Sequence, residues 1–352
     1  MVWGHNTNTV SMIFGFKKDV LHPLKMWAYD FQIKYFGAWR FFMKQMKGQE
    51  KAMMKSHYII NDEQRILTPC IVHTCNGFTW SGGLADRLKG IVSAYEWCKR
   101  HDRPFKINFC EPFNLQDYLV PNEYDWLPND VSYEGRNVLP IICLMEPRIG
   151  KYLADKWNDI FDKWMGKETQ DMSMQYHIYT NVYCSDCNFS HLFNTLFKPC
   201  DRLQKELAHH LDLIGEKYIS ISFRFTTLLG DFTDCTGSPL DTDRKEKLIL
   251  DSLNAIVEIS HKAPKHDMIL VTADSQTFLN RIKYPNVYVV PGKLGHIDYD
   301  HSDDVNMKTF LDFFMISKSE AVYLAKGTGM YNSAFAKTAA MVNDKPFEIF
   351  EY

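Results

Sequence analysis

Short apolar runs alternate with longer amphipathic stretches along most of the chain, and this alternation predicts an α/β protein. The apolar runs at 70–73 and 105–109 suit buried strands, and between them a glycine loop enters a helix. A strand, a helix and a strand at this spacing form a βαβ unit with a parallel sheet. The same pattern predicts further strands at 138–144, 218–225, 267–272, 287–290 and 321–324, and helices at 152–164, 201–213, 245–261, 276–283, 309–317 and 331–341.

The alternation occurs in two successive halves that join near residue 205. Each half suits a Rossmann-like domain, and two such domains are expected to face each other across a cleft in which ligands bind. We therefore divide the chain into an N-terminal basic helical segment (1–65), a first Rossmann-like domain (66–205) and a second Rossmann-like domain (206–352).

The segment 17–55 differs from the rest because it holds nine basic residues against three acidic ones. Its apolar residues follow the three-four spacing of one buried helical stripe from Leu24 to Met46, with Pro23 in the first turn. Such a helix can lie peripherally on an anionic membrane face. It can also pack on its own domain, which is the commoner arrangement for an amphipathic helix.

The composition narrows the class of protein further. With 352 residues, 45% of them hydrophobic and 14% aromatic, the chain suits about two folded domains. The 40 basic and 43 acidic residues nearly balance, which argues against a nucleic-acid-binding protein. Nine cysteines, an odd number lying mostly in apolar runs, suit reduced thiols rather than a disulfide framework. Since there is no apolar run of about 18 residues and no signal pattern at the N-terminus, we expect a cytoplasmic protein.

Glycine-rich and charged residues follow several of the predicted strands. Gly82 and Gly83 precede a helix whose first turn carries Asp86 and Arg87. Such a helix N-terminus can bind an anion or a sugar hydroxyl, although an acid in a first turn is also an ordinary helix-start residue. Arg224 ends the apolar strand that enters the second half. A guanidinium at the carboxyl end of a strand suits a phosphate in the ligand crevice, and the alternative is an ion pair at the domain interface.

Two further strand-to-helix turns offer polar groups. Thr272 and Asp274 follow one strand, where the carboxylate can cap the next helix or bind a ribose or base. Asn332 and Ser333 follow the glycine loop at 327–329, a turn that can cradle a phosphate or ribose. Three such turns at one edge of a sheet indicate a ligand site there.

A metal site has less support. Cys184, Cys187, His191 and Cys200 could ligate zinc, but only one pair has the close spacing that structural zinc sites use twice. No Asp-x-Asp pair stands at the end of a predicted strand. We therefore expect no bound metal.

Taken in order, these residues resemble the fucosyltransferase superfamily of GT-B glycosyltransferases, which includes α1,6-, α1,2- and protein O-fucosyltransferases and bacterial nodulation fucosyltransferases. The resemblance spans residues 74–341 and rests on the motifs SGGLADRLKGIVSAY, ISISFRF, LVTADSQTFLNRIKYPNV and FLDFFMISKSEAVYLAKGTGMYNSAFAKTAA. It implies a GT-B fold with an acceptor side in the first Rossmann-like domain and a nucleotide-sugar side in the second. Arg224 matches the arginine that holds the donor β-phosphate.

Residue by residue, the resemblance implies a nucleotide pocket built from all four motifs. Its expected binding residues are Gly82, Gly83, Arg87, Ser222, Thr272, Asp274, Asp312, Asn332 and Ser333. Ser222 departs from the pattern, because the family commonly has histidine there. Thr227 and Leu228 stand where an acid often follows the arginine. Asp231 and Asp234 are the acids available to replace it.

The resemblance implies an inverting, metal-independent enzyme that moves fucose from GDP-fucose to a hydroxyl of a glycan acceptor, with no cofactor besides the donor substrate. Without a metal, an arginine and helix N-termini must stabilise the leaving diphosphate, and Arg224 suits that role. Inversion also needs a base for the acceptor hydroxyl, for which Asp86 is the first candidate and Asp231 the second. The alternatives are a GT-B transferase with another nucleotide sugar and a non-catalytic glycan- or nucleotide-binding protein.

Overall fold

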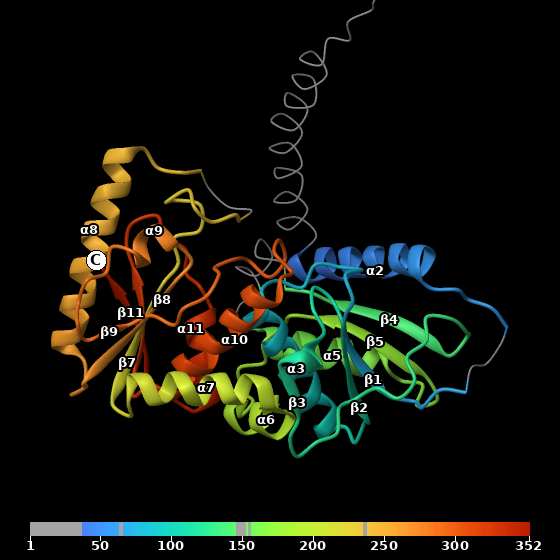
Figure 1. Cartoon of the computed structure of the whole chain (residues 1–352). Coiled ribbons are helices and arrows are strands. Elements are labelled where there is room, and N and C mark those ends of the chain that lie inside the picture. The colour runs from blue at the N-terminus through green and yellow to red at the C-terminus, as the bar shows by residue number, and fades with distance from the viewer. Residues whose placement is uncertain (1–36, 63–65, 146–152, 154–155, 235–237) are drawn as a thin grey trace, which may run out of the picture.

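The computed structural model describes residues 37–62, 66–145, 153, 156–234 and 238–352, and within them each half of the chain forms a parallel sheet (Figure 1). The first sheet has strands β1 (Ile71–Cys75), β2 (Phe105–Phe109), β4 (Val138–Cys143) and β5 (Gln175–Thr180) in the order β2-β1-β5-β4. The second has β7 (Tyr218–Phe223), β8 (Met268–Ala273), β9 (Val287–Tyr288), β10 (Val322–Lys326) and β11 (Phe347–Glu351) in the order β11-β10-β7-β8-β9. The predicted α/β class with two Rossmann-like sheets is confirmed.

Helices pack around these sheets, as the predicted alternation requires. In chain order they are α2 (Ala38–His57), α3 (Leu84–Arg100), α5 (Trp157–Glu168), α6 (Phe189–Leu196), α7 (Asp201–Ile214), α8 (Thr242–Lys262), α9 (Gln276–Leu279), α10 (Asp303–Lys318) and α11 (Phe335–Val342). A short antiparallel pair, β3 (Leu119–Pro121) with β6 (Phe197–Pro199), and a 3₁₀ turn, η1 (Leu115–Asp117), complete the described elements. None of the described helices is long and apolar enough to cross a lipid bilayer.

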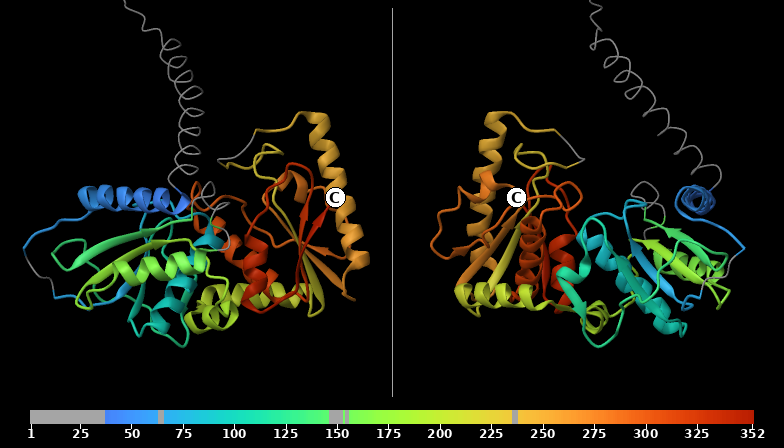
Figure 2. Two further views of the ribbon diagram at one scale, coloured as in Figure 1. Left: turned by 180° about the vertical axis from the view of Figure 1, so that it is seen from behind. Right: turned by 45° about the vertical axis from the view of Figure 1, so that its right-hand side comes forward.

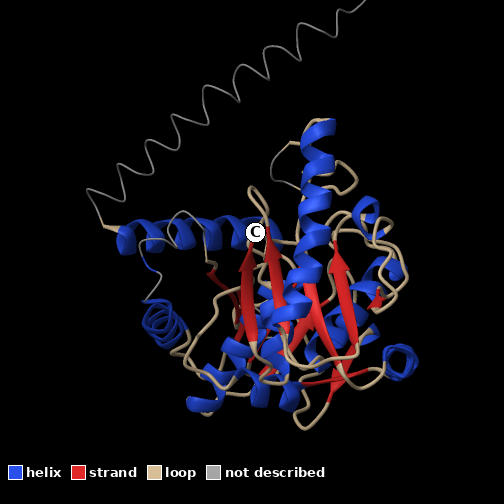
Figure 3. Cartoon of the chain, turned by 90° about the vertical axis from the view of Figure 1, so that its left-hand side faces the viewer, coloured by secondary structure: helices blue, strands red, loops and turns tan. Residues whose placement is uncertain are grey.

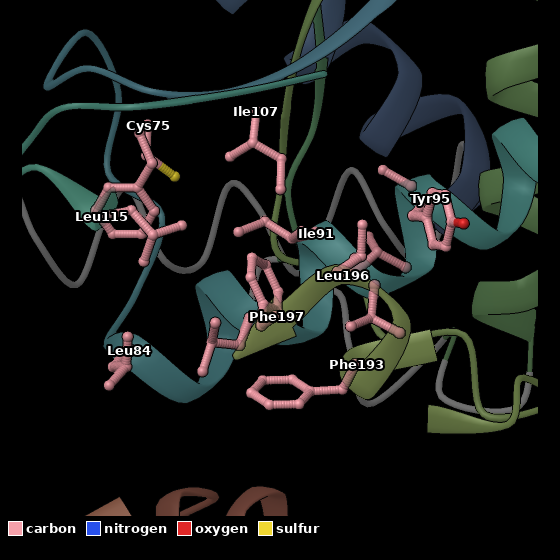
Figure 4. Close-up of a cluster of buried hydrophobic side chains, with 14 of the residues drawn as sticks. Cys75, Leu84, Ile91, Tyr95, Ile107, Leu115, Phe193, Leu196 and Phe197 are labelled. Carbon is pink, nitrogen blue, oxygen red and sulfur yellow. The ribbon is translucent and has the colours of Figure 1, made fainter. Parts of the chain in front are cut away.

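Helix α3 packs closely on the first sheet and contacts β1, β2 and β5. Figure 4 shows Ile91 and Tyr95 of this helix in one buried cluster with Ile107 of β2. The approach is closest at Gly90, where a Cβ atom would lie 2.2 Å from the carbonyl oxygen of Thr180 at the end of β5. Only glycine fits there, because that oxygen belongs to the backbone of a buried strand.

The two halves share one hydrophobic core, which passes through α10 and α11 between the sheets (Figure 2). Phe310 of α10 stacks on Tyr118 of the first half with 4.7 Å between the ring centroids. The hydroxyl of Tyr118 donates a hydrogen bond to Asp303 at 2.6 Å. A second, separate core lies under α8, which covers the other face of the second sheet (Figure 3). The second sheet is therefore covered on both faces.

The bounds of α2 differ from those of the helix predicted in the N-terminal segment. The predicted helix from Leu24 to Met46 does not run through Gly37, whose φ of +80° places it outside helical backbone, and α2 begins at Ala38. Residues 1–36 lie outside the described residues. In α2 the predicted stripe residues Phe42 and Met46 are buried against the first sheet. The described part of this segment thus packs on its own domain.

The contacts of α2 with β4 include hydrogen bonds as well as apolar packing. Glu50 is buried and accepts the backbone N–H of Ile142 at 3.0 Å. The sulfur of Met46 accepts the N–H of Leu144 at 3.4 Å. Strand β4 is an edge of its sheet, so these side chains occupy donors that no neighbouring strand takes.

Several elements differ from the predicted ones. Strands β5 and β11 were not predicted, and neither was α6. All residues of β5 are buried although it contains Gln175, His177 and Thr180, because these polar groups find partners inside the protein. Helix α9 spans four residues instead of the predicted eight, and α10 begins six residues earlier than predicted. The predicted start of the helix at 152 lies outside the described residues.

We expect Gly90→Ala to lower the free energy of unfolding by about 3 kcal/mol, because the new methyl group would overlap the backbone of β5. Gly166→Ala is the matched control. That glycine lies in α5, and a Cβ atom added there would have no neighbour within 4 Å, so alanine should stabilise the helix by up to about 1 kcal/mol. Urea denaturation of both variants measures the difference, and equal stability would contradict the close packing of α3 on β5.

Candidate functional site

A cavity of about 440 Å³ lies where the strand ends of the second half meet the first turn of α3. Residues directly after β7 and β8 and the loop between β10 and α11 line one side of it. Trp80, Gly83 and Asp86 of the first half line the other side. This is the position in which open parallel sheets bind ligands, outside the carboxyl ends of their strands.

Arg224 occupies the centre of an ionic cluster in this cavity. It follows β7 directly, and Asp274 follows β8, the strand that pairs with β7. The Arg224 guanidinium lies 2.6 Å from Asp234 and 3.2 Å from Asp274, and 4.7 Å from the centre of the Phe232 ring. The guanidinium is thus held by two carboxylates and an aromatic face, with part of its surface open to the cavity.

Asp274 is one of the most constrained side chains of the site. Its two carboxylate oxygens accept the backbone N–H groups of Phe225 and Thr226, each at 2.8 Å. Burial raises the pKa of Asp274 above its ordinary value, and Arg224 and the two N–H groups oppose that rise. The carboxylate therefore fixes the backbone just after β7 as well as the arginine.

Ser222 and Thr272 lie two residues before Arg224 and Asp274, on β7 and β8. They are register partners, and their hydroxyl oxygens lie 2.8 Å apart. Both line the cavity. Hydroxyl groups at this position can donate to or accept from a polar ligand.

A buried ion pair from α10 lines the cavity as well. Lys308 and Asp312 are one helical turn apart and hydrogen-bonded, and both are almost fully buried. The Oδ1 atom of Asp312 has no hydrogen-bond partner among the described residues. Burial raises the pKa of Asp312, against the effect of the Lys308 ammonium.

The loop between β10 and α11 adds Asn332 and Ser333 to the lining. The hydroxyl of Ser333 accepts the N–H of Phe335, the first residue of α11, at 3.2 Å. Asn332 is exposed. Both predicted residues therefore lie at the cavity, with Asn332 the more accessible of the two.

The glycine loop before α3 contributes only part of its predicted residues. Gly83 and Asp86 line the cavity, whereas Gly82 and Arg87 do not. Gly82 has a φ of +79°, and a Cβ atom there would lie 2.7 Å from the carboxylate of Asp86. The carboxylate of Asp86 pairs with Lys89 at 2.8 Å. Arg87 is buried behind the cavity wall, 2.6 Å from Asp298.

Asp231, the second candidate for a base, lies outside the cavity lining. Its carboxylate accepts hydrogen bonds from the Ser275 hydroxyl at 2.9 Å and the Thr277 N–H at 2.7 Å. These contacts hold the start of α9, a capping arrangement. Asp234, three residues further on, is the acid that lies beside Arg224.

The loop at 293–299 was not predicted to belong to the site, yet all of its residues line the cavity. Trp80, Phe232 and Lys308 are further lining residues that the sequence did not reveal. The loop follows a two-residue strand and has no regular structure, so no periodic pattern marks it. The dense run of histidine and aspartate at 296–304 was the signal available in the sequence.

The residues considered as zinc ligands do not converge. Among the described residues, no group of three or more histidine, cysteine, aspartate or glutamate side chains is placed to hold a metal ion. Cys184 is buried, and its backbone N–H donates to Ser93. The Cys200 thiol contacts the carbonyl of Asp117 instead.

The fold is that of the GT-B glycosyltransferases, as comparison with solved structures shows, and the expectation of a GT-B fold is confirmed. The NodZ α-1,6-fucosyltransferase, in crystals soaked with GDP-fucose, superposes with a TM-score of 0.50 at 14% identity, over 78% of this chain and 92% of that chain. Selenomethionine NodZ from Bradyrhizobium gives a TM-score of 0.50 at 13% identity, over 77% and 91%. No protein-family model and no curated protein matches the sequence.

We expect Asp312→Ala to destabilise the protein by about 3 kcal/mol, since it leaves the Lys308 ammonium buried without its carboxylate. The double variant Lys308→Met, Asp312→Leu removes both charges and should recover most of that loss. Urea denaturation of the wild type and both variants tests this. A single variant as stable as the wild type would show that Lys308 is not held by Asp312.

Proposed function

We propose that this protein is an inverting, metal-independent glycosyltransferase that moves fucose from GDP-fucose to a hydroxyl of a glycan acceptor. The observation that carries the proposal is the placement of Arg224 at a strand end, inside a cavity lined by both halves of a GT-B fold. The superposition with NodZ, whose crystals were soaked with GDP-fucose, supports it.

The proposed reaction needs positive charge where GDP departs. When the bond between the sugar and the β-phosphate breaks, its electrons remain on the phosphate oxygen, and a fixed guanidinium stabilises that charge. Arg224 is already paired with Asp234 and Asp274. Asp274 is held by backbone donors, so we expect the diphosphate to displace Asp234 from the guanidinium. Arg224 then stabilises the leaving group without a metal ion.

Asp86 is the proposed base. It lines the cavity from the first turn of α3, opposite the strand ends that carry Arg224. In a single displacement the acceptor oxygen attacks the sugar carbon as GDP leaves from the other side, and the acceptor proton passes to a carboxylate. In the resting protein the carboxylate of Asp86 is paired with Lys89.

Aromatic side chains around the cavity suit a carbohydrate acceptor. Four tryptophan, tyrosine or phenylalanine side chains are exposed among the described residues, and three of them line this cavity. Trp80 is 60% exposed, Tyr331 54% and Tyr299 53%. Exposed aromatic faces beside polar groups mark binding surfaces, and the apolar face of a sugar ring can pack on them. We assign the acceptor to the first half (66–205), which contributes Trp80 and Asp86, and the nucleotide to the second (206–352).

The cysteines fit a reducing compartment. All eight cysteines among the described residues are free thiols, and most are buried. Buried free thiols are typical of cytoplasmic proteins, where disulfides are rare. We propose that the reaction takes place in the cytoplasm. A peripheral membrane contact through 17–55 stays a prediction from the sequence.

The first test measures nucleotide selectivity and donor turnover. Calorimetric titration with GDP, UDP and CMP should show selective binding of GDP, and GDP-fucose should be hydrolysed slowly in EDTA. Preference for UDP would point to another nucleotide sugar. Tight GDP binding without any turnover would instead indicate a binding protein.

Arg224→Ala should lower the rate of GDP-fucose turnover by about 100- to 1,000-fold, because it removes the charge that stabilises the leaving group. The control is Arg281→Ala, which removes an exposed arginine paired with Glu246 outside the cavity. Both variants should keep the circular dichroism spectrum of the wild type. Near-normal turnover in folded Arg224→Ala protein would refute the assignment.

Asp86→Asn should reduce transfer by about 100-fold or more while leaving the Kd for GDP close to that of the wild type, since an amide cannot take the acceptor proton. Asp231→Asn is the matched control, because that carboxylate holds α9 and does not line the cavity. Initial rates with saturating GDP-fucose compare the two. A larger loss in Asp231→Asn than in Asp86→Asn would reverse the assignment of the base.

A further inference from the structure

His296 lies in the cavity beside Arg224, in the loop at 293–299 that joins β9 to α10. The two side chains lie around the same aromatic ring: the Arg224 guanidinium is 4.7 Å from the centre of the Phe232 ring, and the His296 ring is 6.3 Å from it. Among the described residues that line this cavity, His296 is the only histidine. The imidazole of His296 is therefore near any ligand that Arg224 binds.

The hydrogen bonds of the imidazole determine which nitrogen carries the proton. The backbone N–H of Asp298 donates to Nδ1 of His296 at 3.2 Å. Because a backbone N–H can only donate, Nδ1 is the acceptor, and the hydrogen of the neutral ring is on Nε2. Burial lowers the pKa of His296, and Arg224 and Arg87 act in the same direction. The Asp298 carboxylate, 3.8 Å from Nδ1, and Asp234 oppose this effect, but the net shift is downward, so the ring is neutral near pH 7.

The Nε2–H group has no hydrogen-bond acceptor among the described residues, whereas the rest of the residue is firmly held. The carbonyl of His296 accepts the N–H groups of Tyr299 and Asp300, each at 2.9 Å. Ile297, the next residue, is buried in the core shared by both halves. The backbone of this turn is therefore fixed, and the residue whose imidazole carries this N–H group lines the cavity.

An ion pair between the two halves of the chain anchors the same turn. Asp298 is bound by Arg87 of α3 at 2.6 Å, and Arg87 also donates to the carbonyl of Gly82 at 2.9 Å. Both charged side chains are largely buried. The nitrogen that orients the imidazole thus belongs to a residue that the first half holds in place.

The charges of the cavity make a neutral donor useful there. Every aspartate in the lining is paired with a cation: Asp86 with Lys89, Asp234 and Asp274 with Arg224, Asp298 with Arg87, and Asp312 with Lys308. Arg224 faces two carboxylates, so its charge is largely offset before any anion arrives. An N–H donor that carries no charge of its own adds a hydrogen bond without attracting a further carboxylate.

We propose that His296, like Arg224, binds the nucleotide-sugar donor. The Nε2–H group of His296 donates a hydrogen bond to an oxygen of the diphosphate that Arg224 binds. The inference rests on the proposed function and adds a binding residue to it. When the bond between the sugar and the phosphate breaks, the electron pair stays on the phosphate oxygen and the hydrogen stays on Nε2. The hydrogen bond strengthens as the negative charge grows, which makes His296 a stabiliser of the leaving group.

The test compares His296→Ala with His296→Gln, in which the side-chain amide keeps an N–H at a similar distance from the backbone. His296→Ala should weaken GDP binding about tenfold and slow GDP-fucose hydrolysis more than that. His296→Gln should recover most of both losses. His266→Ala, which removes a histidine outside the cavity, should behave like the wild type.

Nuclear magnetic resonance of ¹⁵N-histidine-labelled wild-type protein gives a readout that does not depend on how the variants fold. The His296 ring should show the neutral pattern with hydrogen on Nε2, and addition of GDP should shift the Nε2 and Hε2 signals. Unchanged signals at saturating GDP would overturn the proposal, as would GDP binding and hydrolysis of wild-type strength in His296→Ala.

Arg224→Ala separates this proposal from the proposed function. If Arg224→Ala loses GDP binding and turnover while His296→Ala keeps both, the proposed function stands and the role of His296 is wrong. If the wild type neither binds GDP nor hydrolyses GDP-fucose, the proposed function and the inference fail together.

Discussion

Strands β7 and β8 pair in parallel, with Ser222 opposite Thr272 and Phe223 opposite Ala273. Because of this register, the chain leaves both strands at the same level of the sheet, and Arg224 and Asp274 emerge side by side. The carboxylate of Asp274 then binds both the guanidinium and the backbone that carries it. A shift of one residue in the register would turn these side chains to opposite faces of the sheet, and Arg224 and Asp274 could no longer form an ion pair. The geometry of the cavity thus derives from hydrogen bonds within the sheet.

The sequence predicted the elements in which periodicity is strong. Strand β2 was predicted at its observed bounds, and α7 and α8 within a few residues of theirs. Strand β5 is not predicted by the sequence pattern, because its polar side chains are buried with partners from distant segments. The hydroxyl of Tyr58, for example, is hydrogen-bonded to His177, which is 119 residues away in the chain. No local pattern can show such a partner. Burial of β5 is a tertiary effect that overrides its polar composition.

In the candidate site, too, the sequence predicts the residues at strand ends but not those on loops. Ser222, Arg224, Thr272 and Asp274 lie at strand ends, where topology brings them together, and the sequence was enough to place them at one edge. The sequence does not distinguish Asp231 from Asp234, since only two loop residues separate the acid that caps α9 from the one that binds Arg224. Likewise, the loop at 293–299 reaches the cavity only because Arg87 and the shared core hold it there. Residues on loops are positioned by contacts that local sequence does not encode.

The hydrogen bonds between α2 and β4 bear on whether the edge of the first sheet can pair with a strand of another chain. An edge strand exposes N–H and C=O groups that can pair with a strand from another chain, and sheet proteins blunt such edges with charges, bulges or covering segments. In this protein Glu50 and Met46 occupy the N–H groups of Ile142 and Leu144, and a carboxylate is placed where an incoming strand would have to pair. Helix α2 therefore covers this edge of the first sheet, and a strand from another chain could pair there only by displacing the side chains of Glu50 and Met46.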